Sequence, residues 1–182
     1  MITLDLDGVI YDFVGELLEQ LRNKHGISKN RSSIYDYNIA KSLNIDSSII
    51  QSIVNDNATY TKRDKIYAHA IPFVNFIRRS HRVIILTSRP ECVKETTLSF
   101  LSDNKIYYDD IYFGNKSSVI EKLRPDIVVE DDPNIAILAS RFAKIVFLVV
   151  AKYNKDIFGE NIFHIRSLGN IVNYIKTGYY DV

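Results

Sequence analysis

The sequence has a single cysteine, few glycines and prolines, and no tryptophan. Cys92 alone excludes an intrachain disulfide and a zinc site built from several cysteines, and we expect its side chain to pack in the interior. Seven glycines and four prolines among 182 residues exclude long flexible linkers and low-complexity tracts. The longest apolar runs, such as residues 145–151, are far shorter than the roughly 20 residues of a membrane-spanning helix.

An excess of charge of one sign is also absent. The chain has 23 Lys and Arg residues against 22 Asp and Glu residues, which gives a formal net charge of +1. Without a net positive field, long nucleic acid is not an expected partner. The first residues lack the basic and apolar stretches of a signal peptide. We therefore expect a cytoplasmic protein that does not bind a membrane.

The sequence does contain short apolar runs that alternate with helical patterns. Between most of these runs, apolar residues recur at the three- and four-residue spacing of an amphipathic helix. Strands that are apolar throughout and alternate with helices are typical of a parallel sheet covered on both faces. We therefore predict an α/β, Rossmann-like fold with strands at residues 2–6, 83–86, 111–113, 127–129 and 145–150.

One gap in this alternation is too long for an ordinary crossover between parallel strands. The first predicted strand ends at Leu6 and the next begins near Val83, whereas a crossover needs only one helix. The gap is rich in helical patterns, and Asp46 is a suitable N-cap for one of them. We predict that residues 10–72, the cap segment, form a small helical domain inserted after the first strand. Residues 1–9 and 73–182 would form the core.

Polar residues follow the predicted strands, at the place where an open α/β sheet binds its ligands. Two carboxylates follow the first strand, hydroxyls and an arginine follow the second, and a lysine and further acids come later. Such a set suits a phosphate group together with a hard divalent cation such as Mg²⁺. Its members are Asp5, Asp7, Thr87, Ser88, Arg89, Lys116, Glu130, Asp131 and Asp132.

The first two carboxylates have complementary uses in phosphoryl transfer. Asp5 and Asp7 are two residues apart in a predicted strand, so their side chains would project to the same side and repel each other without a bridging cation or a shared proton. One carboxylate can attack phosphorus, and the other can protonate the leaving oxygen and then activate water. Lys116 and the Thr87 hydroxyl would offset charge on the transferred group, and Lys122, within a helix, is the weaker alternative to Lys116.

These motifs, in this order, resemble those of the haloacid dehalogenase (HAD) superfamily. Asp5-Leu6-Asp7-Gly8-Val9 is similar to its first motif, and Thr87, Lys116 and Glu130-Asp131-Asp132 are similar to the next three. The resemblance spans nearly the whole chain. It implies a Mg²⁺-dependent phosphohydrolase in which Asp5 is the nucleophile and Asp7 the general acid and base. It also implies that the magnesium ligands are the Asp5 carboxylate, the Asp7 backbone carbonyl and Asp131.

Within this superfamily, the chain most resembles the 5′(3′)-deoxyribonucleotidases and their bacterial and phage relatives. The run 5–13, the length of the cap segment and the pair Tyr153-Asn154 are similar to that group. The resemblance implies a (deoxy)nucleoside monophosphate as substrate, with Phe13 near the base. Two positions depart from the usual pattern of the group, namely Arg89-Pro90 after Thr-Ser, and Glu130 where aspartate is common.

The residues leave several roles open. Ser88 and Arg89 are predicted to bind substrate, although Arg89 could instead form a structural ion pair. Phe13 lies on an apolar stripe and could belong to the core, while Glu130 and Asp132 could either support the site or lie at the surface. Five tyrosines of the cap segment could face the site or the core, namely Tyr11, Tyr35, Tyr37, Tyr60 and Tyr67.

Alternative functions also remain open at this point. The same chemistry would serve the 3′-phosphate end of a nucleic acid, a sugar phosphate or an amino-acid phosphate. A catalytically silent phosphate-binding module on the same fold is a third possibility, because a fold does not determine a function. The expected partner is a small phosphomonoester, and a homodimer is compatible with the sequence.

Overall fold

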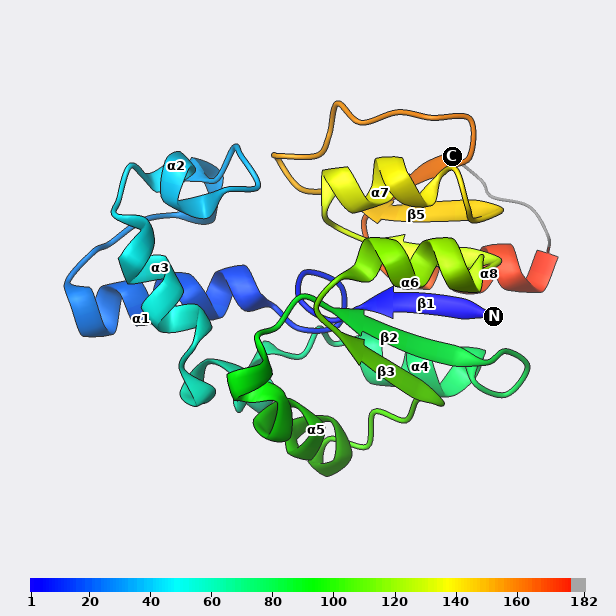
Figure 1. Ribbon diagram of the computed structural model, residues 1–182, viewed down its shortest axis with the longest axis horizontal. Helices are drawn as coiled ribbons and strands as arrows, with labels where there is room; N and C mark the ends of the chain where they lie inside the picture. Colours follow the sequence, from blue (N-terminus) through cyan, green and yellow to red (C-terminus); the bar gives the residue numbers. More distant parts are fainter. Residues whose placement is uncertain (178–182) are drawn as a thin grey trace.

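The computed structural model describes residues 1–177 and contains one six-stranded sheet (Figure 1). Every neighbouring pair of strands is parallel, and the strands lie in the order β3-β2-β1-β4-β5-β6. β1 is therefore central, although it comes first in the chain. The strands are β1 (Ile2–Asp5), β2 (Val83–Thr87), β3 (Asp110–Phe113), β4 (Ile127–Glu130), β5 (Ile145–Val149) and β6 (Ile162–Ile165).

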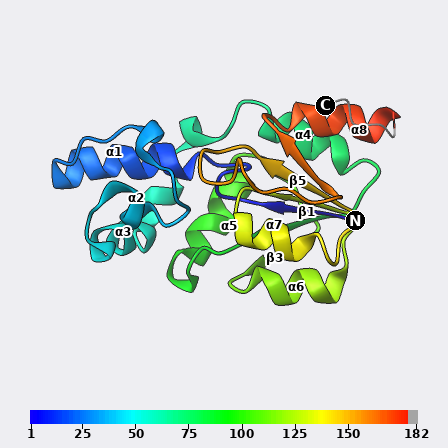
Figure 2. The same cartoon turned by 90° about the horizontal axis from the view of Figure 1, so that it is seen from above.

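Helices cover both faces of the sheet, as Figure 2 shows. Successive strand residues point to opposite faces, so Val83 and Ile85 of β2 belong to one apolar cluster, and Ile84 and Leu86 belong to another. Helices α4 and α8 pack on the first cluster, and helices α6 and α7 pack on the second. The predicted α/β, Rossmann-like fold with helices on both faces is confirmed. The bounds are α4 (Ala70–Ile77), α6 (Lys116–Leu123), α7 (Pro133–Ala139) and α8 (Gly169–Thr177), and α5 (Lys94–Asp103) lies between β2 and β3.

The cap segment holds three further helices, which extend beyond the end of the sheet at the left of Figure 1. They pack around a third apolar cluster that includes Leu17, Leu21 and Ile53. α4 begins at Ala70 and packs on the sheet, so the predicted boundary between residues 72 and 73 lies inside its first turn. The helices are α1 (Phe13–His25), α2 (Ile39–Leu43) and α3 (Ser47–Val54).

Side-chain caps account for where several helices begin. Asp12 accepts a hydrogen bond from the Gly15 N–H at the start of α1, and Asp46 caps α3 as predicted. At the other end of α1, Gly26 adopts the left-handed conformation with φ of 67°, which ends the helix. These local signals set where α1 begins and ends and where α3 begins.

Two predictions from the sequence were wrong. Strand β6 was not predicted, because three of its four residues are only partly buried at the edge of the sheet and His164 interrupts their apolar pattern. Cys92 is exposed instead of packed, because it lies in the short turn that precedes α5. Among residues 1–177, no helix has both the length and the apolar composition needed to cross a membrane.

Candidate active site

The candidate site lies where the strand order reverses. β1 pairs with β2 on one side and with β4 on the other, so the loops that follow β1 and β4 diverge and leave a crevice at their carboxyl ends. A pocket of about 490 Å³ occupies this position, between the core and the cap segment. The core lines it with Asp5, Asp7, Gly8, Ser88, Arg89, Lys116 and Asp131, and the cap segment adds mainly apolar and aromatic side chains, including Phe13, Ile39, Ile50, Tyr37 and Tyr60.

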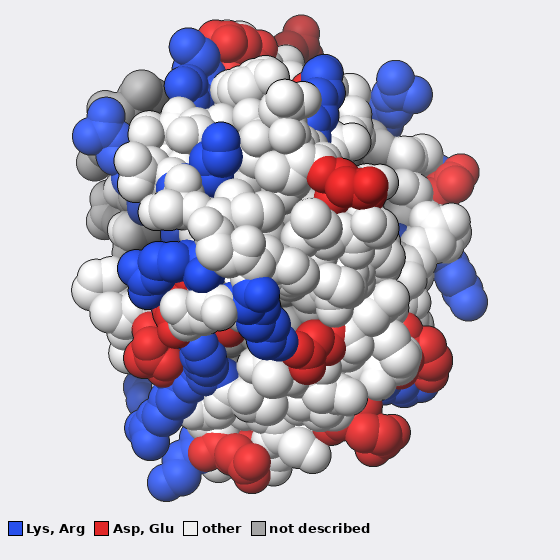
Figure 3. Space-filling model, turned by 90° about the vertical axis from the view of Figure 1, so that its left-hand side faces the viewer, with Lys and Arg blue, Asp and Glu red and all other residues white. Residues whose placement is uncertain are grey.

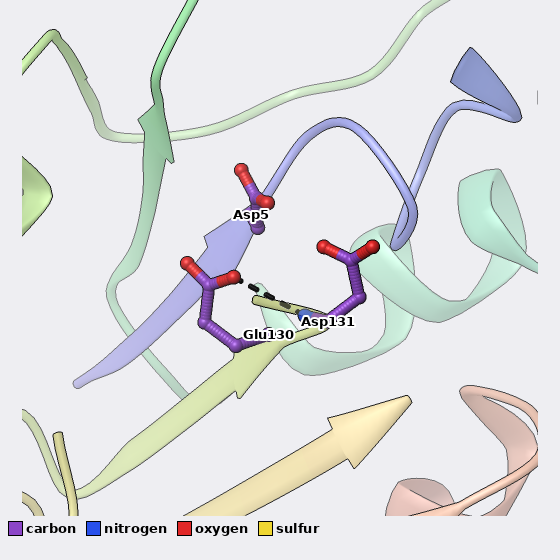
Figure 4. A group of neighbouring side chains, drawn as sticks. All are labelled: Asp5, Glu130 and Asp131. Carbon is purple, nitrogen blue, oxygen red and sulfur yellow. Dashed lines mark hydrogen bonds between the residues drawn. The ribbon is translucent and has the colours of Figure 1, made fainter. Parts of the chain in front are cut away.

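Three buried carboxylates meet in the crevice (Figure 4). Oxygens of Asp5, Glu130 and Asp131 all lie within 4.8 Å of one another. Lys116 is buried beside them, with its Nζ 3.0 Å from Asp5 Oδ2 and 2.5 Å from Glu130 Oε1. With every group ionised, three negative charges and one positive charge leave a net charge of −2 in a space that water barely reaches.

The pKa values of the cluster reflect this imbalance. Burial raises the pKa of Asp5, even though Lys116 opposes the change. Burial, together with the charge of Asp5, raises the pKa of Asp131 to about 8 and that of Glu130 well above its usual value. Burial alone would lower the pKa of Lys116, but the two carboxylates beside it raise that pKa instead. A divalent cation would balance the excess negative charge, and the all-oxygen donor set is the kind that Mg²⁺ prefers.

Both carboxylate oxygens of Glu130 accept hydrogen bonds from protein groups. Oε1 contacts Lys116, and Oε2 accepts the N–H groups of Asp131 and Asp132 at 3.1 and 3.2 Å. Asp132 in turn caps α7 by accepting the Asn134 N–H at 2.8 Å. Both acids are buried, and they shape the loop that presents Asp131.

Two further residues orient Asp131 from the loop after β5. The Tyr153 hydroxyl donates a hydrogen bond to Asp131 Oδ2. Asn154 is fully buried, and its Nδ2 lies 2.8 Å from the Asp131 carbonyl and 2.9 Å from the Val149 carbonyl. The carboxylate and the backbone of Asp131 are thus both fixed by the same short segment.

Gly8 allows the loop after β1 to approach Asp131 closely. Its φ is +85°, and a Cβ atom placed on it would lie 2.2 Å from Asp131 Oδ2. Any side chain at this position would therefore displace the Asp131 carboxylate. On the other side of the crevice, the Leu6 N–H donates to Asp5 Oδ1 at 2.7 Å and helps to orient Asp5.

Asp7 and Asp5 line the same pocket, but not for the predicted reason. β1 ends at Asp5, so Asp7 belongs to the loop that follows and not to the strand. Arg89 contacts both Asp7 oxygens, with Nη2 2.7 Å from Oδ1 and Nε 2.9 Å from Oδ2. Of the two roles left open for Arg89, the structure contains the ion pair.

The hydroxyls after β2 differ in their surroundings. Thr87 is fully buried at the end of the strand, and its Oγ1 accepts the backbone N–H of Arg89 at 3.2 Å. Ser88 is exposed and lines the pocket. Lys122, the alternative to Lys116, is exposed and lies outside the pocket.

Aromatic side chains from the cap segment form the far side of the pocket. Phe13 is half-buried and lines the pocket, with its ring stacked on that of Tyr60 at a centroid distance of 6.2 Å. Tyr37 also lines the pocket and contacts the Tyr153 ring edge-on. The other three tyrosines in question are not among the lining residues: Tyr11, Tyr35 and Tyr67.

Tyr153 and Tyr37 contact the site in ways that the residue patterns did not specify: Tyr153 was named only for the family resemblance, and Tyr37 only as one of five tyrosines that could face the site or the core. Tyr153 follows the end of β5, so the rule that placed Asp5 and Asp131 at strand ends could also have singled it out. Tyr37 lies in a loop of the cap segment, and nothing in its sequence surroundings distinguishes it from Tyr35, which is also exposed but does not line the pocket.

At the level of sequence, the similarity of this chain to known proteins is distant. No protein-family model matches the chain. The curated protein "Putative nucleotidase YqfW" of Bacillus subtilis (strain 168) is 23% identical over 178 residues, which cover 95% of this chain and 92% of that protein.

Solved structures are similar over nearly the whole length at low sequence identity. L-2-haloacid dehalogenase from Xanthobacter autotrophicus matches with a TM-score of 0.62 and 11% identity over 98% of both chains. The "putative HAD-hydrolase YfnB" from Bacillus subtilis, bound to magnesium, matches with a TM-score of 0.63 and 11% identity over 96% of this chain and 97% of that one. CbbY from Rhodobacter sphaeroides, in complex with phosphate, matches with a TM-score of 0.58 and 12% identity over 93% and 95%. The chain therefore has the fold of the HAD-like hydrolases.

Proposed function

We propose that this protein is a Mg²⁺-dependent phosphomonoesterase that acts on nucleoside monophosphates. The observation that carries the proposal is the environment of Asp5. This buried carboxylate lies at the reversal point of the sheet, 3.0 Å from Lys116 and in one cluster with Asp131, at the charged end of a pocket whose other end is lined mainly by apolar and aromatic side chains. Such a pocket suits a substrate with a charged phosphate at one end and a flat organic group at the other.

In the proposed first step, an Asp5 carboxylate oxygen attacks phosphorus and the bond from phosphorus to the ester oxygen breaks. Asp7, which lines the same pocket, gives its proton to the leaving oxygen. In the second step, Asp7 takes a proton from water, the water oxygen attacks phosphorus, and the bond from phosphorus to Asp5 breaks. Inorganic phosphate and the free carboxylate of Asp5 are restored. Lys116 and Thr87 offset the charge of the phosphoryl group in both steps.

The residues present fit a magnesium ion. Three buried carboxylates share one lysine, so the cluster has an excess of negative charge and an all-oxygen donor set. Asp5, Asp131 and the Asp7 backbone carbonyl would hold the ion, while the Glu130 oxygens contact Lys116 and backbone N–H groups. When bound, Mg²⁺ supplies positive charge next to the phosphoryl oxygens.

The pocket and two comparisons support a nucleoside as the organic part of the substrate. Phe13, Tyr37 and Tyr60 offer ring faces and edges for an aromatic base, while Asn38 and Gln51 offer amide groups for its polar edge. The similarity to YqfW, whose name describes a nucleotidase, and the resemblance of run 5–13 to the deoxyribonucleotidases favour the same substrate class.

The surface around the cap segment supports a small substrate over a polymer. Figure 3 views this end of the molecule and shows Lys and Arg side chains interspersed with Asp and Glu side chains. Sequence-independent binding of a nucleic-acid strand needs a continuous basic track, and none is visible on the face shown.

A phosphate-release panel tests the proposal. The wild-type protein is assayed with Mg²⁺ on 5′- and 3′-nucleoside monophosphates, a 3′-phosphorylated oligonucleotide, sugar phosphates and phosphoserine. We expect the highest kcat/KM on a nucleoside monophosphate and loss of turnover in EDTA that added Mg²⁺ restores. Full activity in EDTA would refute the metal requirement. Faster release from another phosphoester would refute the substrate class, and tight phosphate binding without any turnover would favour a silent binding module.

A further inference from the structure

Arg89 contacts both oxygens of the Asp7 carboxylate and so restricts its rotation. Nη2 and Nε lie 2.7 and 2.9 Å from the two Asp7 oxygens, so two donors of the planar guanidinium fork each engage one carboxylate oxygen. The two residues are 82 positions apart and come from the loops after β2 and β1. The contact therefore fixes one strand-end loop to the other through the side chain of Asp7.

The guanidinium is itself held from several directions. Nη1 donates to Thr97 Oγ1 at 3.2 Å, and the central carbon lies 4.1 Å from the ring centre of Tyr60 and 5.1 Å from that of Tyr11. Both rings are buried, and hydrogen bonds from their hydroxyls to backbone carbonyls fix them. Arginine over aromatic faces in a buried position gains both cation–π attraction and packing. Moving Arg89 away from Asp7 would break all of these contacts together.

Exposure separates the roles of the two partners. Both residues line the pocket, but the Arg89 side chain is 0% exposed, whereas the Asp7 side chain is 24% exposed. Each carboxylate oxygen has two acceptor positions, and the Arg89 contact uses one on each oxygen. Asp7 therefore keeps one lone-pair position on each oxygen for the proton that it gives and takes, while the Arg89 guanidinium is engaged by Asp7 and Thr97.

We propose that Arg89 is a positioning residue that holds the Asp7 carboxylate in the orientation needed for proton transfer in the pocket. The inference rests on the proposed function, in which Asp7 gives and takes the proton. The physical reason is that proton transfer needs heavy atoms about 2.6–3.2 Å apart, so a carboxylate free to rotate would spend little time in reach. A lysine has no planar fork and could hold the position of Asp7 but not its plane.

A double-mutant cycle tests whether Arg89 acts through Asp7. The variants are Arg89→Met, Arg89→Lys, Asp7→Asn and the double variant Asp7→Asn/Arg89→Met. Arg78→Met serves as the matched control, because Arg78 pairs with Asp109 and does not line the pocket. Each variant is assayed for phosphate release from the best nucleoside monophosphate, after circular dichroism has shown that it is folded.

We expect Arg89→Met to lower kcat by roughly 10-fold or more with KM changed by less than about 2-fold, because in this proposal Arg89 acts on the reaction through Asp7 and not by binding substrate. Arg89→Lys should remain clearly impaired, and Arg78→Met should match the wild type. In the Asp7→Asn background, Arg89→Met should cause no further loss. The first turnover of p-nitrophenyl phosphate should lose less than about 2-fold, because its leaving group needs no proton.

If the fold-loss in kcat of the double variant equals the product of the two single losses, the inference is overturned, because Arg89 would then act independently of Asp7. A raised KM at unchanged kcat would overturn it too, because Arg89 would then contact the substrate. Full activity of Arg89→Lys would refute the need for the planar fork, and this variant keeps the test decisive if Arg89→Met does not fold. A wild-type protein that releases no phosphate, or Asp7→Asn at the wild-type rate, would instead contradict the proposed function.

Discussion

Lys116 is the single cation among three buried carboxylates, so its removal should destabilise the fold strongly. In Lys116→Met the side chain keeps much of its length and apolar stem, but the ammonium within 3.0 Å of Asp5 and 2.5 Å of Glu130 is lost. Removing one partner of a buried ion pair leaves an uncompensated charge and costs about 3–5 kcal/mol. That is a large part of the roughly 5–15 kcal/mol by which a folded domain is stable.

Urea denaturation in EDTA measures the cost. With an m-value of about 2 kcal/mol/M, a loss of 3–5 kcal/mol lowers the midpoint by roughly 1.5–2.5 M. Lys122→Met is the matched control, because Lys122 lies on the same helix and is exposed, and its change should stay within about 0.5 kcal/mol. Equal midpoints for Lys116→Met and Lys122→Met would refute the interpretation of Lys116 as the cation that balances the buried carboxylates.

Three further predictions follow from other contacts. Gly8→Ala should lower the free energy of unfolding by about 1–2 kcal/mol or more and weaken Mg²⁺ binding, because its Cβ would meet Asp131 Oδ2. An unchanged unfolding free energy and Mg²⁺ affinity would contradict the close approach. Mg²⁺ at a hundredfold excess over its Kd should add about 2.7 kcal/mol and raise the Tm by roughly 5–10 °C in a thermal shift assay, and an equal shift in Asp131→Asn would exclude Asp131 as a ligand. Hydrogen bonds from Lys62 and Lys65 lower the pKa of Glu19 to about 2, so this carboxylate stabilises the fold above its unfolded pKa of 4.5 and the effect is lost as pH falls towards 2. The Tm difference between the wild type and Glu19→Gln should therefore be largest near neutral pH and shrink below pH 4.5, and a constant difference would contradict this interpretation.

The sheet and the polar end of the site could be predicted from local patterns. Continuous apolar runs predicted five of the six strands, and parallel strands bring their carboxyl ends to one edge. That rule alone places Asp5, Lys116 and Asp131 near one another, and their roles in the proposed reaction remain to be tested. Strand β6 was missed because an edge strand that is only partly buried needs no continuous apolar pattern.

The pairing of side chains between loops could not be predicted in the same way. Arg89 reaches Asp7 because two loops 82 residues apart meet and two tyrosines cover the guanidinium, and no short-range pattern encodes such a meeting. The choice of which tyrosines line the pocket depends likewise on how the cap segment packs against the core. Tyr37 lines the pocket and Tyr35 does not, although both are exposed and they lie only two residues apart in the sequence.

The rate of phosphate release by Asp5→Asn tests the central claim most directly, because the account assigns the attack on phosphorus to this carboxylate. The variant is compared with the wild type on the same nucleoside monophosphate and Mg²⁺ concentration, with Asp110→Asn as a control at an exposed ion pair away from the pocket. The account predicts that Asp5→Asn stays folded but releases phosphate only at the background rate, while Asp110→Asn matches the wild type. A folded Asp5→Asn variant that retains a near wild-type rate would contradict the account.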